Sequence, residues 1–153
     1  TAPARSIEDR SKQPLQNNPF CRPPIFLTDA AMGNLSTGKI GEDMAAAYLE
    51  AAGYRIVERN YRCPLGEIDL IALEGDTLVF VEVKSRRSEN YGLPQLAVGP
   101  GKQRRISKIS LYYLQSRRLD PASVRFDVVA ILLRPEKTSI ELIKDAFELA
   151  YGR

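Results

Sequence analysis

Two strand-like apolar runs joined by a Gly-Asp dipeptide at positions 75–76 constrain this chain more than any other feature. The runs cover residues 66–73 and 77–84. Gly-Asp between two such runs is a signal for a β-hairpin with a two-residue turn. A turn of this length pairs Glu74 with Thr77, and that pairing fixes which side chains lie opposite each other along both strands.

The same register gathers acidic side chains at the open end of the hairpin. It puts Asp69 opposite Glu82 and Glu67 opposite Lys84, and strand alternation sets all four on one face. Directly opposed residues have Cβ atoms about 4.5–5.5 Å apart. We therefore expect three carboxylates and one ammonium group to meet at the end of an otherwise apolar face. The second strand is almost wholly apolar around Glu82, which predicts burial on both faces.

The acidic pair has a specific chemical use. Two adjacent carboxylates repel each other unless a cation lies between them. The chain has no histidine, which excludes Ser-His-Asp triads and His-ligated metal sites. The ligands available at this pair are therefore carboxylate oxygens, which suit hard cations such as Mg²⁺ or Mn²⁺. A cation held by Asp69 and Glu82 would polarise a phosphoryl oxygen and lower the pKa of a bound water. Lys84 would orient or deprotonate the nucleophile and stabilise developing charge.

The same residues also have a purely structural interpretation. An acid and a lysine on an edge strand often form a solvated pair, and Glu67 with Lys84 would be a cross-strand salt bridge worth less than ~1 kcal/mol. Burial of the second strand favours the functional interpretation, because a buried charge is costly without a partner.

Apolar periodicity predicts further elements around the hairpin. A helix is expected from Thr37 to its end at Gly53, with these residues on the helical period: Ile40, Met44, Ala47, Tyr48 and Ala51. Strands are expected over 54–60, 124–133 and 139–143, and a second helix over 102–119 with Ile106, Ile109, Tyr113 and Leu114 as its apolar stripe. The order αβββαββ predicts a mixed α/β domain with a central sheet flanked by helices.

Positive charge is concentrated in one part of the chain. The net charge is +3, but residues 84–118 hold nine basic side chains and a single acid. Cations lie at the N-terminal end of the second predicted helix, where the helix dipole disfavours them. Phosphate neutralisation explains this better than a solvated helix face, so the expected partner is a nucleic acid. The basic patch is assigned to Arg86, Arg87, Lys102, Arg104, Arg105 and Lys108.

Composition bounds the compartment and the domain. The two cysteines lie far apart and cannot form a four-cysteine zinc site, so a reducing, cytoplasmic location is expected. No apolar run approaches the ~20 residues of a membrane span, so no membrane association is expected.

Residues 1–31 hold five prolines and no glycine, and we expect a poorly ordered tail over 1–34 before one domain over 35–153. Met32 is a candidate for the natural first residue.

Two runs of the hairpin resemble a known family. Gly-Glu-Ile-Asp-Leu-Ile-Ala at 66–72, followed by Val-Phe-Val-Glu-Val-Lys-Ser-Arg at 79–86, resembles the bacterial YraN-like proteins. These in turn resemble archaeal Holliday-junction resolvases of the PD-(D/E)xK, restriction-endonuclease-like superfamily. Gly-x-x-Gly-Glu at 38–42 and Arg-Phe-Asp-Val-Val at 125–129 extend the likeness to about residues 35–150. The resemblance implies a restriction-endonuclease-like fold.

The resemblance also implies an activity and a set of site residues. The activity is metal-dependent cleavage of DNA, branched or junction DNA in particular, to 5′-phosphate products; symmetric cutting would require a homodimer. The implied metal ligands are Asp69, Glu82, the backbone carbonyl of Val83 and the helix acid Glu42. Lys84 matches the catalytic lysine, and Gln103 looks like an auxiliary polar residue beside the nucleic acid. Glu67 stands near the usual Pro-Asp pair, but this chain has no proline there.

Several features leave alternatives open. Asp127 is either a supporting acid of the site or an ordinary strand-end charge. Residues 33–39 fit seven positions of a phosphate-binding P-loop, but Ile40 stands where Ser or Thr must reach Mg²⁺. The glycines of this stretch are instead expected to allow a close approach at the start of the helix. The alternative functions are a non-catalytic nucleic-acid-binding protein that retains the fold, and a structural partner protein.

Overall fold

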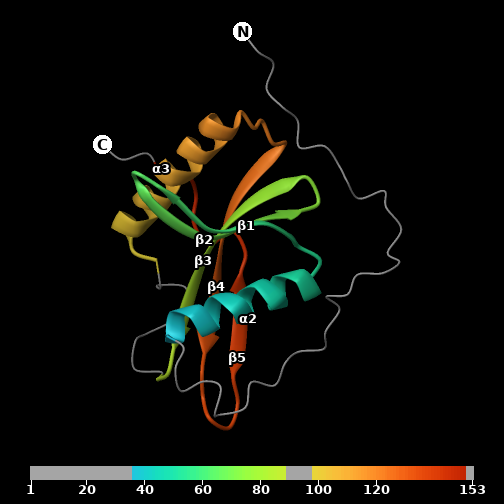
Figure 1. Cartoon of the computed structure of the whole chain (residues 1–153), viewed down its shortest axis with the longest axis vertical. Coiled ribbons are helices and arrows are strands. Elements are labelled where there is room, and N and C mark those ends of the chain that lie inside the picture. Colours follow the sequence, from blue (N-terminus) through green and yellow to red (C-terminus); the bar gives the residue numbers. More distant parts are fainter. Residues whose placement is uncertain (1–35, 89–97, 151–153) are drawn as a thin grey trace.

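A five-stranded mixed sheet with strand order β1-β2-β3-β4-β5 forms the centre of the computed structural model, which describes residues 36–88 and 98–150 (Figure 1). The strands are β1 (Arg55–Cys63), β2 (Gly66–Glu74), β3 (Thr77–Arg86), β4 (Ser123–Leu132) and β5 (Ser139–Ile143). Helix α2 (Thr37–Ala51) precedes the sheet, and α3 (Pro100–Arg117) connects β3 to β4. The predicted mixed α/β class and the order αβββαββ are confirmed. The tail expected over 1–34 and the candidate first residue Met32 lie outside the described residues.

The β2–β3 hairpin has the register that its turn predicts. Glu74 pairs with Thr77, and the ladder continues regularly to Leu70 opposite Val81. Gly75 has a φ of +57°, the left-handed conformation that glycine adopts without steric cost in a tight hairpin turn. Asp69 and Glu82 are the next residues along the two strands.

Strand β3 lies in the middle of the sheet, between β2 and β4. Its pairing with β4 is parallel, because α3 carries the chain back across the sheet, and the other pairs are antiparallel. Residues Leu78 to Glu82 are buried, so the predicted burial of this strand on both faces is confirmed. Phe80 belongs to the core beneath α3, whereas Val79 and Val81 belong to the core beneath α2.

The apolar face of α3 lies as predicted, whereas that of α2 departs from the predicted stripe at three positions. On α3 the predicted stripe is confirmed, with Ile106, Ile109 and Tyr113 buried and Leu114 partly buried. On α2 the buried side chains are Ile40, Ala45, Ala46 and Leu49. The predicted α2 stripe is wrong at Ala47, Tyr48 and Ala51, which are exposed. The helix is rotated so that the edge carrying Ala45 and Ala46, and not the edge carrying Ala47 and Tyr48, faces the sheet.

The helix boundaries follow their capping residues. Helix α3 begins at Pro100, two residues earlier than predicted, because proline suits the first turn of a helix. It ends at Arg117, and the next residue, Arg118, takes a left-handed φ of +52°.

In the part of the chain that the structure describes, neither helix combines the length and apolarity needed to cross a membrane.

Candidate active site

Asp69 and Glu82 lie close together at the end of the hairpin, as the register predicts. The Val83 backbone N–H donates a 2.8 Å hydrogen bond to Asp69 Oδ2, so the Asp69 carboxylate reaches across to β3 beside Glu82. Glu82 is only 5% exposed. Burial first, and then the negative charge of Glu82, raise the pKa of Asp69 to about 7, against the lowering effect of the Val83 N–H. Burial and the charge of Glu82 therefore disfavour the ionised form of Asp69 at this acidic corner, which is formed by Asp69 and Glu82.

Two lysines supply positive charge to the same corner. Lys84 Nζ lies 3.1 Å from Glu82 Oε1, and Lys102 Nζ lies 3.2 Å from that same oxygen. Lys84 follows Glu82 on β3, whereas Lys102 reaches it from the first turn of α3. The charge of Lys102 also lowers the pKa of Asp69. Sequence reasoning placed Lys102 only in the basic patch, because nothing local to the sequence shows that α3 starts beside Glu82.

Glu42 is a more distant member of the acidic group. Asn60 Nδ2 donates a 2.7 Å hydrogen bond to Glu42 Oε2, which holds this carboxylate towards β1. Its charge still contributes to raising the pKa of Asp69. Within residues 36–88 and 98–150, however, no three His, Cys, Asp or Glu side chains are arranged to hold one metal ion. The fit to a cation rests on two carboxylates, Asp69 and Glu82, a set that Mg²⁺ commonly completes with water.

Glu67 does not join this group, which corrects the expectation of three carboxylates. Its side chain is 57% exposed and forms an ion pair with Arg62 on β1, at 3.2 Å. Strict alternation would put Glu67 on the same face as Ile71, but Ile68 packs into that core instead. The alternation shifts because the β2–β3 ladder ends at residue 70, and beyond it β2 follows only β1. Lys84 accordingly pairs with Glu82 and not with Glu67.

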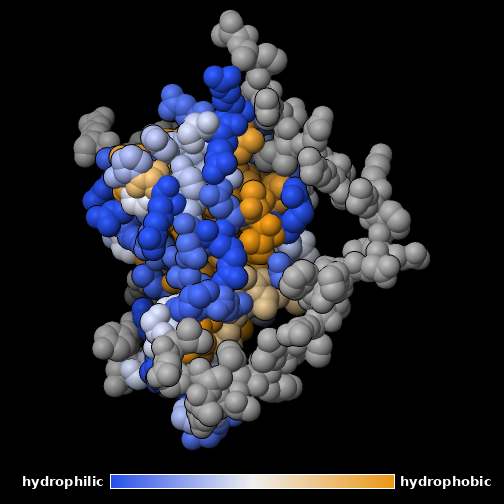
Figure 2. All heavy atoms as spheres, viewed as in Figure 1, coloured by the Kyte–Doolittle hydropathy of each residue, from blue (hydrophilic) through white to orange (hydrophobic). Residues whose placement is uncertain are grey.

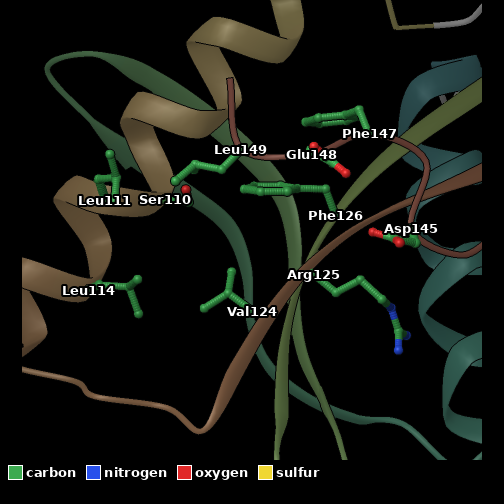
Figure 3. A pocket seen from close by; sticks show the side chains of 10 residues that line it. All are labelled: Ser110, Leu111, Leu114, Val124, Arg125, Phe126, Asp145, Phe147, Glu148 and Leu149. Atoms are coloured by element: carbon green, nitrogen blue, oxygen red, sulfur yellow. The ribbon is translucent and has the colours of Figure 1, made fainter. Parts of the chain in front are cut away.

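The basic patch extends from the end of β3 along α3. Arg104, Arg105 and Lys108 are exposed on α3, and Figure 2 shows hydrophilic side chains over this helix. Arg86 ends β3 and is partly buried. Arg87 Nε donates to Thr37 Oγ1 at 3.0 Å, and Gln103 Nε2 donates to the Val98 carbonyl at 2.8 Å. Arg87 therefore contacts the start of α2, and Gln103 holds the chain that leads into α3.

Comparison with known proteins identifies the family of this chain. Residues 41–131, which include every predicted acidic ligand and Lys84, match the uncharacterised protein family UPF0102. The chain belongs to this family. The match confirms the YraN-like resemblance read from the hairpin motifs.

UPF0102 relatives align over most of their own length. The UPF0102 protein of Syntrophus aciditrophicus (strain SB) is 76% identical over 120 residues, which cover 78% of this chain and 94% of that protein. UPF0102 protein GSU0650 of Geobacter sulfurreducens is 56% identical over 119 residues, covering 77% and 93%. Among solved structures, one titled "Crystal structure of SSO0001" has 14% identity and a TM-score of 0.32, covering 72% of this chain and 51% of that one, a likeness too weak to inform the fold or the site.

Asp127 lies away from the acidic pair of this UPF0102 chain. It is fully buried and accepts hydrogen bonds from Arg125 Nε at 2.7 Å, from Arg125 Nη2 at 2.8 Å and from the Asp145 N–H at 3.0 Å. Tyr54 OH donates a further bond at 3.2 Å. Asp127 pairs with Val81 across the β3–β4 ladder, on the face towards α2 and opposite to that of Glu82. It is the centre of a buried polar network, a role that neither sequence interpretation anticipated.

The close approach at the start of α2 comes from Gly41. A Cβ on Gly41 would lie 2.6 Å from Ser85 Cβ, whereas a Cβ on Gly38 would meet nothing within 4 Å. The expectation for the glycines of the P-loop-like stretch is therefore wrong at Gly38. Ser85 Oγ also donates to the Thr37 carbonyl at 3.0 Å. These contacts seat α2 against the end of β3, directly after Lys84.

Proposed function

We propose that this UPF0102 protein is a divalent-cation-dependent endonuclease that hydrolyses DNA phosphodiester bonds and leaves 5′-phosphates, with branched or junction DNA as its substrate class. One observation carries the proposal. Asp69 and Glu82 share a largely buried corner with Lys84, next to the basic patch of α3. A buried carboxyl group whose pKa is raised, as that of Asp69 is, beside a second carboxylate is typical of functional sites.

Each residue of the acidic corner and its surroundings has a separate role in the proposed reaction. Asp69 and Glu82, with the Val83 carbonyl, would hold Mg²⁺ or Mn²⁺, which when bound would polarise a phosphoryl oxygen of the substrate and lower the pKa of a bound water. Asp69, whose pKa is raised to about 7, would have to lose any proton it carries in order to act as a ligand, so cation binding should strengthen as the pH rises. Lys84 Nζ donates hydrogen bonds to the nucleophile and to the phosphate oxygens, where negative charge develops. Glu42 adds negative charge at longer range.

The basic patch would bind the phosphate backbone of the substrate. Arg104, Arg105 and Lys108 are exposed on the helix that also delivers Lys102 to the corner. Contacts of such side chains to phosphates position a duplex without reading its sequence, which fits recognition of DNA by its shape. Affinity should therefore fall steeply with rising salt concentration.

A second candidate function is nucleic-acid binding without catalysis. The two lysines on Glu82 favour this function, because their ammonium groups balance the charge of the buried carboxylate without a metal ion. A binder of this kind would show the same salt dependence but no metal requirement.

A nicking assay separates these functions. Pure protein is incubated with branched and linear DNA in Mn²⁺, in Mg²⁺ and in EDTA. We expect cation-dependent cleavage, a loss of at least ~100-fold in Lys84→Ala and Asp69→Asn, and retained DNA binding. Glu67→Gln is the matched control, because it neutralises an acid of the same strand outside the corner, and it should keep wild-type activity. The new 5′ ends should accept a phosphate label only after phosphatase treatment.

Two results would contradict catalysis. Cleavage that persists in EDTA or in Lys84→Ala would come from a contaminating nuclease. Salt-dependent binding without any cleavage would favour the non-catalytic binder. Mass photometry on the DNA complex tests the homodimer that symmetric cutting requires.

A further inference from the structure

The two lysines on Glu82 are not equivalent. Lys84 follows Glu82 by two residues on the same strand, so strand geometry alone brings them to one face. Lys102 comes from another element, across the core, and its Nζ nevertheless lies 3.2 Å from the oxygen that Lys84 contacts at 3.1 Å. One carboxylate oxygen thus carries two ammonium groups.

The position of Lys102 has an electrostatic cost that its contact with Glu82 offsets. Lys102 lies in the first turn of α3, where the helix dipole disfavours a cation. Glu82 is 5% exposed, and a carboxylate buried to that degree is costly unless it is paired. The Lys102 side chain is 35% exposed, so it can move into solvent without disturbing the core.

A divalent cation held by Asp69 and Glu82 would bind the same Glu82 carboxylate that the two lysines contact. Both ammonium groups contact Glu82 Oε1, and the charge of Lys102 is also felt by Asp69, whose pKa it lowers. Lys102 therefore acts on both carboxylates that the proposed function assigns to the cation. Positive charge on Lys102 and a cation held by these carboxylates oppose each other.

We propose that Lys102 is the built-in counter-ion of the cation-free site and competes with the divalent cation for Glu82. This inference rests on the proposed metal site. Lys102 acts through Glu82, so it is a positioning residue that sets the cation concentration at which the site fills. It keeps the acidic corner folded and neutral until the cation replaces it.

Mn²⁺ binding to the protein alone tests this role, without DNA and without any activity measurement. Free Mn²⁺ is titrated by electron paramagnetic resonance for the wild type and for three variants. Lys102→Gln should bind Mn²⁺ about ten-fold more tightly than the wild type, within the usual range of coupling between competing charges. Lys102→Arg keeps the charge and should return the affinity to within about two-fold of the wild type. Lys108→Gln removes the same charge from an exposed position of the same helix and should change the affinity less than about two-fold.

The outcomes separate this inference from the proposed function. Tighter binding in Lys102→Gln alone supports the counter-ion role, because damage to the fold would weaken binding. Unchanged or weaker binding in Lys102→Gln, while the wild type binds Mn²⁺ and Asp69→Asn does not, overturns the inference and leaves the metal site standing. Equal tightening in Lys108→Gln would show a general charge effect and would also overturn it. If neither the wild type nor Lys102→Gln binds Mn²⁺, the metal site itself is wrong, and the inference falls with it.

Discussion

Two glycines three residues apart in α2 test how this helix is seated against β3. We expect Gly38→Ala to stabilise the protein and Gly41→Ala to destabilise it. Replacing a helical glycine by alanine raises the free energy of unfolding by ~0.5–1 kcal/mol, because the unfolded chain then has less conformational freedom to lose on folding. We expect this stabilisation at Gly38, because nothing lies within 4 Å of the new methyl group.

At Gly41 the same gain is outweighed by a collision. The new Cβ would lie 2.6 Å from both Cβ and Oγ of Ser85, about 1 Å closer than carbon atoms normally approach. Rotation of the Ser85 side chain moves Oγ but leaves Cβ in place, so the helix must shift away from the strand. Overpacking of this kind costs ~1–3 kcal/mol. Subtracting the gain from this cost leaves a net loss of up to about 2.5 kcal/mol.

Urea denaturation of both variants measures the difference. A second substitution sharpens the test, because Ser85→Gly removes both colliding atoms, whereas Ser85→Ala keeps Cβ. Gly41→Ala combined with Ser85→Gly should recover ~1 kcal/mol or more relative to additive behaviour, and the combination with Ser85→Ala should recover little. Equal stabilisation by Gly38→Ala and Gly41→Ala would refute the close approach of α2 to β3.

Two further predictions concern buried carboxylates. The pKa of Asp69 is raised from 3.8 to about 7, so the folded state binds a proton that the unfolded state releases, and stability should fall as the pH rises from about 4 to about 7. Urea denaturation across this range should give a wild-type stability that falls with pH faster than that of Asp69→Asn, by up to ~1.4 kcal/mol per pH unit, and parallel curves would contradict the shift. Asp127→Ala removes the acceptor of two Arg125 hydrogen bonds inside the core and should cost about 3 kcal/mol, whereas a loss below ~1 kcal/mol would show that the network contributes little.

The sequence by itself determined the hairpin and the acidic pair. The Gly-Asp turn fixes Glu74 opposite Thr77, and two-residue alternation then carries Asp69 and Glu82 to one face of neighbouring strands. The apolar stripe of α3 and the double-sided burial of β3 were predictable in the same way. Each of these features follows from residues a few positions apart, where covalent geometry leaves little choice.

Only the tertiary structure decided which other charges join that pair. Glu67 turns to Arg62 because β2 leaves the β3 ladder beyond residue 70. Lys102 reaches Glu82 because α3 packs with its first turn at the end of β3. Asp127 faces the opposite core. These contacts join segments far apart in the sequence, and their geometry depends on how helices and strands pack together, which local periodicity does not encode.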